Sequence, residues 1–413
     1  MQTNLADFIK DTAEGTEAEA ILRRCVHCGF CLATCPTYQL LGDELDSPRG
    51  RIYLIKQMLE GEPVTDKTQL HLDRCLTCRA CETTCPSGVE YGKLVDIGRH
   101  VMEQKVPRST ADHAKRFVLR KLLSNSRKFK HCLTLGRATK PLLPKAIQKK
   151  IPSAKIALPK SNSSHQRKML LLEGCVQPSL EPNIDAASSR VLDAIGVSLI
   201  SAKSANCCGA ISLHLNAQEE ALNFARRNID AWWPYVEEGV EAIIVTASGC
   251  GTMLQDYGRL LRHDPIYAQK AKVVSNLFRD LSQVIYAEKD KLCALIGKSH
   301  QTDSKVIAFH SPCSLQHGLK IRGIVEELIK TCGYTLSYVP DSHLCCGSAG
   351  TYSLLQPEIS KQLLDRKIIG LESGKPDLIA TANIGCLTHI TSEASLPVKH
   401  WIELIDEKIL NRI

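Results

Sequence analysis

Two cysteine runs near the N-terminus constrain this chain of 413 residues more than any other feature. Each run has the spacing Cys-x2-Cys-x2-Cys-x3-Cys-Pro, and the runs begin at Cys25 and Cys75. Three cysteines at this spacing surround one [4Fe–4S] cubane, while the fourth, before proline, is carried toward the other cubane by the helix that follows. The spacing therefore predicts two adjacent clusters, one held by Cys25, Cys28, Cys31 and Cys85 and the other by Cys75, Cys78, Cys81 and Cys35.

Zinc and disulfide alternatives fit these runs poorly. A structural zinc site uses two pairs of ligands, which differs from three close cysteines with a fourth before proline. Residues 1–20 are polar and acidic and lack the regions of a secretory signal, so we expect a cytoplasmic protein with reduced thiols. No apolar run reaches the roughly 18–20 residues that span a bilayer. The 19 cysteines are thus expected to be metal ligands, redox thiols or small buried residues.

The cysteines beyond residue 166 reveal an internal duplication. Two sets share the order of one cysteine, a Cys-Cys-Gly triplet and a last cysteine. They are Cys175, Cys207, Cys208 and Cys250, then Cys313, Cys345, Cys346 and Cys386. The interval from the first cysteine to the triplet is identical in the two sets, and the interval from the triplet to the last cysteine is nearly so. Agreement at all three points indicates two copies of one unit.

Hydrophobic patterns predict the fold class. Residues 16–24, 49–60 and 94–106 are predicted helices around the first two runs, where no strand pattern occurs. In each later copy, apolar runs that precede cysteines alternate with helical stretches, which favours parallel sheets with cysteines at the carboxyl ends of strands. We expect an α+β multidomain protein, in which an α-helical ferredoxin-like module precedes a duplicated α/β Cys-Cys-Gly domain. The expected boundaries are 1–106 for the module, 107–166 for a basic linker, and 167–300 and 301–413 for the two copies.

A basic band separates the two parts of the chain. The chain carries a net charge of +8, but residues 105–168 hold 18 Lys or Arg and a single acid, Asp112. Prolines interrupt this band, which is predicted to be a linker with one helix at residues 111–135. Its composition fits an interfacial helix on an anionic membrane, a solvated linker or a docking surface for an acidic subunit. No recognised nucleic-acid-binding module surrounds it, so nucleic acid is not an expected partner.

The Cys-Cys-Gly sets leave two interpretations open, a third iron–sulfur centre or structural and thiol-redox roles. Met253 and His389 stand where a further cysteine would complete a Cys-x2-Cys pair. His310, His343 and His389 lie beside the second set, and we expect hydrogen bonding rather than ligation for each. Between the first two runs, a positive charge near thiolates would raise a cluster potential. We favour Arg49 for this role and expect Arg51 to be solvated at a helix start.

No site for an organic redox cofactor is evident. No G-x-G-x-x-G follows a predicted strand, because Gly249-Cys250-Gly251 lacks the third glycine, and there is no P-loop. No residue of this chain is expected to act on an organic substrate. The chain can carry electrons but requires a partner whose cofactor collects them.

The motifs resemble those of the glycolate oxidase iron–sulfur subunit family along nearly the whole chain. The resemblance is carried by residues 24–53, 73–88, 213–219, 340–352 and 381–389 and is weakest over 105–167. It implies flavin-bearing partner subunits that hold FAD and oxidise glycolate to glyoxylate, with this chain passing electrons to an acceptor such as quinone. It also implies a peripheral position on the inner face of a bacterial inner membrane.

Two related layouts offer alternatives. Subunits of heterodisulfide reductases are similar and imply thiol–disulfide reduction at the Cys-Cys-Gly sets. The iron–sulfur subunit of anaerobic glycerol-3-phosphate dehydrogenase is also similar and implies electron transfer for a different substrate.

Overall fold

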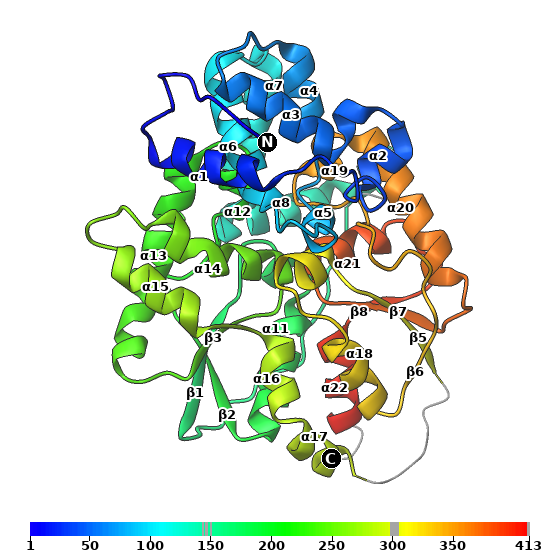
Figure 1. The fold of residues 1–413 in the computed structure, drawn as a ribbon. Coiled ribbons are helices and arrows are strands. Elements are labelled where there is room, and N and C mark those ends of the chain that lie inside the picture. Colours follow the sequence, from blue (N-terminus) through cyan, green and yellow to red (C-terminus); the bar gives the residue numbers. More distant parts are fainter. Residues whose placement is uncertain (143, 145–147, 149–150, 298–304, 411–413) are drawn as a thin grey trace.

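The computed structural model describes residues 1–142, 144, 148, 151–297 and 305–410. The N-terminal module consists of helices and loops, with no strand among its described residues, as predicted (Figure 1). Its elements are α1 Ala13–Arg24, α2 Pro36–Leu41, the 3-10 turn η1 Glu44–Asp46, α3 Pro48–Leu59, α4 Asp66–Asp73, α5 Ala80–Thr83 and α6 Tyr91–Lys105.

Capping and close packing explain how these helices form a support for the cysteine loops. Helix α3 begins at Pro48, which fits the first helical position, and the hydroxyl of Ser47 accepts a hydrogen bond from the Gly50 amide at 2.9 Å. Helices α3 and α6 approach closely at Gly98, where an added Cβ would lie 2.6 Å from the side chain of Ile55. The buried faces of α1, α3 and α6 form one core.

The basic segment folds into two helices rather than the single helix predicted. They are α7 Thr110–Leu123 and α8 Ser126–Thr139, followed by the 3-10 turn η2 Lys140–Leu142. The break occurs because the Asn125 side chain caps α8, accepting a hydrogen bond from the Lys128 amide at 3.0 Å. Helix α7 is tied to the module by an ion pair of 2.9 Å between Arg116 and Asp73. This part of the band is therefore packed on the protein body.

The duplicated part contains two four-stranded parallel sheets, ordered β2-β1-β3-β4 and β6-β5-β7-β8. The strands are β1 Arg167–Leu172, β2 Val197–Ser201, β3 Ala242–Val245, β4 Phe278–Asp280, β5 Val306–His310, β6 Thr335–Leu336, β7 Leu378–Thr381 and β8 Val398–His400. Corresponding strands take the same place in both sheets, which confirms the predicted duplication and parallel α/β arrangement.

Helices cover both sheets. In the first half they are α10 Gln177–Leu180, α11 Pro182–Ala194, α12 Ala210–His214, α13 Gln218–Glu237, α14 Ser248–Leu260, α15 Ala268–Leu277, α16 Leu281–Ala287 and α17 Lys289–Ile296. In the second they are the π-helical turn η3 Ser314–Gly318, α18 Ile324–Thr331, α19 Tyr352–Leu355, α20 Pro357–Glu372, α21 Ile384–Thr391 and α22 Trp401–Leu410.

The two halves share one hydrophobic core. Helix α11 of the first half packs against α22 of the second, and α16 packs against α18 in the corresponding arrangement. An ion pair of 2.5 Å joins Arg190 to Asp406, and the buried His400 ring lies 3.0 Å from the Thr246 carbonyl oxygen. The segments predicted as separate copies therefore stabilise each other across a continuous apolar interface.

The N-terminal module lies as a cap over one end of the two halves (Figure 1). It contacts the first half through Arg79, which is 3.2 Å from Asp256, and the second half through the Tyr352 hydroxyl, which donates to the Arg74 carbonyl at 2.9 Å. The cysteine loops of the module thus face the cysteine-bearing end of the duplicated part.

In the described ranges, no helix is both long and apolar enough to cross a membrane.

Candidate metal centres

Left-handed backbone residues shape both cysteine loops of the module. His27 and Gly29 have φ of 57° and 85° in the first loop, and Thr77 and Arg79 have φ of 54° and 59° at the matching positions of the second. Each pair flanks the second cysteine of its run, so the chain reverses twice within one Cys-x2-Cys-x2-Cys segment. Non-glycine residues rarely adopt this conformation, which marks these loops as functional turns.

The two loops enclose two adjacent cavities. The outer cavity is lined by Cys25, Cys28, Cys31 and Cys85, and the inner cavity by Cys35, Cys75 and Cys78. Cys81 lines both, as do Pro48 and Tyr91, so the cavities share a wall. The structure thus gathers four cysteines of each predicted ligand set around one space, including the two that cross over from the other run.

The charges around the cavities differ. Desolvation raises the pKa of Cys31 to about 11, so iron binding at the outer cavity must displace a proton from this thiol. At the inner cavity, burial alone would raise the pKa of Cys75, but the guanidinium groups of Arg51 and Arg99 outweigh it and lower that pKa. The inner cavity is therefore prepared for anionic sulfur by two fixed positive charges.

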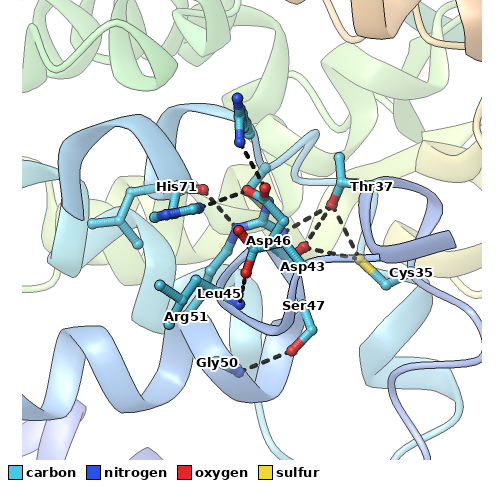
Figure 2. A network of polar contacts seen from close by, with 12 residues as sticks. Cys35, Thr37, Asp43, Leu45, Asp46, Ser47, Gly50, Arg51 and His71 are labelled. Carbon is cyan, nitrogen blue, oxygen red and sulfur yellow. Dashed lines mark hydrogen bonds and ion pairs between the residues drawn. The ribbon is translucent and has the colours of Figure 1, made fainter. Parts of the chain in front are cut away.

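Arg51 is one of the most buried side chains of the module, and the prediction that it is solvated was wrong. It is 1% exposed and lies 3.2 Å from Asp46, which is fully buried (Figure 2). Arg74 and His71 also contact the Asp46 carboxylate, at 2.8 and 3.1 Å. Asp46, His71 and Asp43 form a candidate metal group by distance alone, but two arginines already neutralise this carboxylate and disfavour a cation.

The same network reaches a cluster cysteine. The Thr37 hydroxyl accepts a hydrogen bond from Arg51 at 3.1 Å, donates to the Asp46 carbonyl at 2.8 Å and lies 3.3 Å from the sulfur of Cys35 (Figure 2). Arg49, the arginine favoured from the sequence, lines the outer cavity and pairs with Glu44 at 2.8 Å. Each cavity thus has its own arginine, and only that of the inner cavity is fully buried.

Two further groups hold the inner loop. Arg99 on α6 donates to the carbonyl of Cys75 at 2.6 Å and to the hydroxyl of Thr77 at 2.9 Å. The buried Tyr91 hydroxyl lies 3.5 Å from the sulfur of Cys75. Sequence analysis did not identify Arg99 or Tyr91 as site residues. Both lie on α6, after the cysteine runs, and the pattern of this helix indicates only its apolar face.

The cysteines of the second half lie next to the inner cavity. The sulfurs of Cys313 and Cys345 are 3.8 Å apart, and the thiols of Cys345 and Cys346 are hydrogen-bonded. Cys346 in turn contacts Cys386. Cys313 and the module's Cys78 both pack on the apolar cluster that includes Cys345, and repulsion from Cys313 adds to burial in raising the pKa of Cys78. The predicted second set is therefore assembled beside one cluster site.

The cysteines of the first half also come together. The free thiol of Cys175, after β1, lies near that of Cys207, and the free thiol of Cys208 lies near that of Cys250 on α14. Cys207 and Cys208 are buried, and Asn228 donates to the Cys207 carbonyl at 2.9 Å. All four predicted residues of this set are thus assembled at the end of the first sheet.

The glycine of each triplet is required by space and conformation. Gly209 and Gly347 have φ of 94° and 89°, and an added Cβ would lie 2.8 Å from the Ala221 carbonyl oxygen or 2.6 Å from that of Ser360. A side chain would therefore push the cysteines away from the helix behind them, α13 or α20.

The residues that replace the missing cysteines have other contacts. Met253 is buried in the apolar core of the first half. The His389 ring lies 3.1 Å from the Ser360 hydroxyl. His310, in contrast, has ligand atoms within 4.8 Å of the sulfurs of Cys346 and Cys386. The expectation of a hydrogen bond holds for His389, whereas neither ring nitrogen of the buried His310 has a hydrogen-bond partner in the described structure.

Comparisons with known proteins agree with this architecture. Residues 21–89 match the 4Fe–4S dicluster domain, and residues 169–255 and 307–391 match the cysteine-rich domain, twice. These matches confirm iron–sulfur clusters as cofactors of the chain, and the thiol-lined cavities fit them.

Several curated proteins are similar over most of their length. The glycolate oxidase iron–sulfur subunit of Escherichia coli is 53% identical over 99% of both chains. The probable glycolate oxidase iron–sulfur subunit of Bacillus subtilis is 30% identical over 89% of this chain and 88% of its own. Lactate utilization protein A of Bacillus pumilus is 25% identical, over 58% of this chain and 100% of its own. This chain therefore belongs to the family of glycolate oxidase iron–sulfur subunits.

Proposed function

We propose that this chain is the electron-transfer subunit of a flavin-dependent glycolate dehydrogenase. Partner subunits that carry FAD oxidise glycolate to glyoxylate, and this chain passes the electrons to the respiratory chain, with quinone as the acceptor. The observation that carries the proposal is the pair of thiol-lined cavities with a shared wall. A flavin releases two electrons per substrate, and two [4Fe–4S] clusters in contact range accept them one at a time.

The ligands of these clusters are proposed residue by residue. Cys25, Cys28, Cys31 and Cys85 hold the outer cluster, and Cys75, Cys78, Cys81 and Cys35 hold the inner one. The support is that each set lines one cavity, although its members come from two runs well separated in the chain. The remaining eight cysteines, Cys175, Cys207, Cys208, Cys250, Cys313, Cys345, Cys346 and Cys386, are proposed as redox or metal residues of the duplicated part.

The outer cavity is the proposed site of electron uptake from the flavin-bearing partner. Cys28 is exposed, and the rim residues Val26 and Phe30 are 67% and 62% exposed. Apolar side chains at such exposure next to a redox centre favour contact with another protein. The inner cavity lies against the second half instead, so electrons that enter at the outer cluster continue inward.

Reconstitution tests this function. The chain and its flavin-bearing partner subunits are purified separately and anaerobically, and glycolate-dependent dye reduction is measured for each and for the mixture. We expect reduction of the clusters only in the mixture, with about eight iron atoms in this chain. Glycolate oxidation by this chain alone would overturn the assignment of the substrate site to a partner.

We also propose that α8 makes peripheral contact with an anionic membrane surface at the inner face of the inner membrane. Arg127, Lys128 and Lys130 lie on α8, and no ion pair joins any of them to another described residue. Lys121 on α7, by contrast, pairs with Glu220 at 2.6 Å. Each unpaired basic residue near an anionic bilayer contributes about 1 kcal/mol.

Vesicle sedimentation tests this contact. Vesicles with and without anionic lipid are mixed with the chain at low and high salt, and the bound fraction is measured. Binding is expected to need anionic lipid, to fall at high salt and to weaken when Arg127, Lys128 and Lys130 are changed to Gln. Neutralising Lys121, which is already paired, serves as the matched control. Binding that ignores both salt and the α8 substitutions would exclude the contact.

A further inference from the structure

His310 is a buried side chain with nothing to bond to. It ends β5, is 1% exposed, and neither Nδ1 nor Nε2 has a hydrogen-bond partner among the described residues. Buried polar groups in folded proteins are nearly always paired, because an unpaired one costs roughly 1–3 kcal/mol. At least one ring nitrogen therefore needs a partner that the described residues do not supply.

The surroundings of this ring identify the kind of partner. One ring nitrogen of His310 and the sulfurs of Cys346 and Cys386 all lie within 4.8 Å of one another, and all three residues are buried. Two donors bound to one tetrahedral zinc ion, at about 2.0–2.3 Å each, lie about 3.3–3.8 Å apart. Each separation within this group of three donors is therefore at most about 1 Å longer than that spacing. Sulfurs that ligate different irons of a cubane lie farther apart.

The duplication provides an internal comparison. When Cys175 is aligned with Cys313, Leu172 of the first half stands at the position of His310. Leu172 is buried in the apolar core beside Cys208, the counterpart of Cys346. The two halves thus share their cysteines but differ at the last residue of the first strand, Leu172 in β1 and His310 in β5.

We propose that the second half binds one four-coordinate zinc ion through His310, Cys346 and Cys386. Nitrogen and thiolate donors in a tetrahedral arrangement are the set that zinc prefers. The first half, with leucine at this position, lacks the site.

Metal analysis of anaerobically purified full-length chain tests the site. The native chain is expected to hold one zinc in addition to the iron of its two clusters, and His310→Leu, which copies the first half, is expected to lose that zinc and keep the iron. His343→Asn is the control, because this histidine lies three residues before Cys346 but outside the group. Equal zinc in the native chain and His310→Leu, or no zinc in the native chain after incubation with Zn²⁺, would overturn the proposal.

Iron content and visible absorbance report separately on the clusters, so this test is independent of electron transfer. If His310→Leu loses iron as well, X-ray absorption at the zinc edge of the native chain decides instead. A four-coordinate shell containing two sulfurs and at least one imidazole nitrogen supports the site. A shell of sulfur alone excludes His310 as a ligand.

Discussion

The outer and inner cavities have the same cysteine spacing but different surroundings. The outer cavity opens to solvent past Phe30 and has a half-buried arginine, Arg49, paired with Glu44. The inner cavity borders the second half through Leu76 and Cys78 and has the buried cations Arg51 and Arg99. Positive charge and hydrogen bonds to sulfur raise the potential of a cluster. The difference supports the proposal that the outer site receives electrons and the inner site draws them inward.

Substitution of the cluster cysteines is expected to have the largest effect on electron transfer. It also tests which cysteines bind the cluster of each cavity. Cys28→Ser and Cys85→Ser should remove the same outer cluster, while Cys78→Ser and Cys35→Ser should remove the inner one. Each variant should lose about half of its iron and reduce glycolate-dependent electron transfer by at least about 100-fold. Electron paramagnetic resonance of the reduced protein identifies the lost signal. Pairing of Cys85 with Cys78 rather than with Cys28 would refute the crossed assignment.

The next largest effect is expected on the free energy of unfolding when the buried arginine of the inner site is replaced. Arg51→Met leaves Asp46 buried without its most buried cation, so we expect a loss of unfolding free energy on the order of 3 kcal/mol. The partly exposed pair of Arg49 and Glu44 is the control, and Arg49→Met should cost less than about 1 kcal/mol. Anaerobic denaturant titration measures both. Equal losses in the two variants would remove the distinction between the cavities.

A smaller effect is expected at the rim of the outer cavity. Phe30→Glu places a charge in the proposed contact with the flavin-bearing partner and should slow cluster reduction by that partner about 10-fold, equivalent to about 1.4 kcal/mol. Tyr338→Glu is the control, because Tyr338 is 81% exposed in the second half. Stopped-flow reduction measures the rate, and iron content should be unchanged in both. A rate unaffected by Phe30→Glu would place electron uptake elsewhere.

The smallest effect is expected on the reduction potential of the inner cluster, and it tests how the two clusters differ in potential. Tyr91→Phe removes the hydroxyl 3.5 Å from the sulfur of Cys75. Loss of a hydrogen bond of about 0.5–1 kcal/mol should lower the potential of the inner cluster by roughly 20–40 mV for a one-electron couple. Tyr53→Phe, on the exposed side of the module, should leave both potentials unchanged. Redox titration followed by paramagnetic resonance measures them, and a shift of the outer cluster alone would contradict the assignment of Cys75.

Residue spacing and hydrophobic patterns were enough to predict the cluster runs, the duplication and the alternation of strands and helices. Each of these is a local or periodic property, since ligand spacing and hydrophobic repeats are written along neighbouring residues. The reason for the glycine in each triplet is tertiary instead, since Gly209 and Gly347 lie against carbonyl oxygens of α13 and α20. The basic segment was predicted less well, because a single cap at Asn125 was enough to divide one amphipathic pattern into two helices.

Which of these residues come into contact depends on the tertiary structure. Arg51 is buried because it pairs with Asp46, whose carboxylate also contacts Arg74 and His71 from a separate segment, and no local pattern distinguishes Arg51 from Arg49. His310 is similarly a candidate ligand only because the fold places it near Cys346 and Cys386, which are distant from it along the chain. Burial and pairing across such separations depend on how the layers pack, so the spacing of residues identifies the ligands while the fold determines their electrostatic environment.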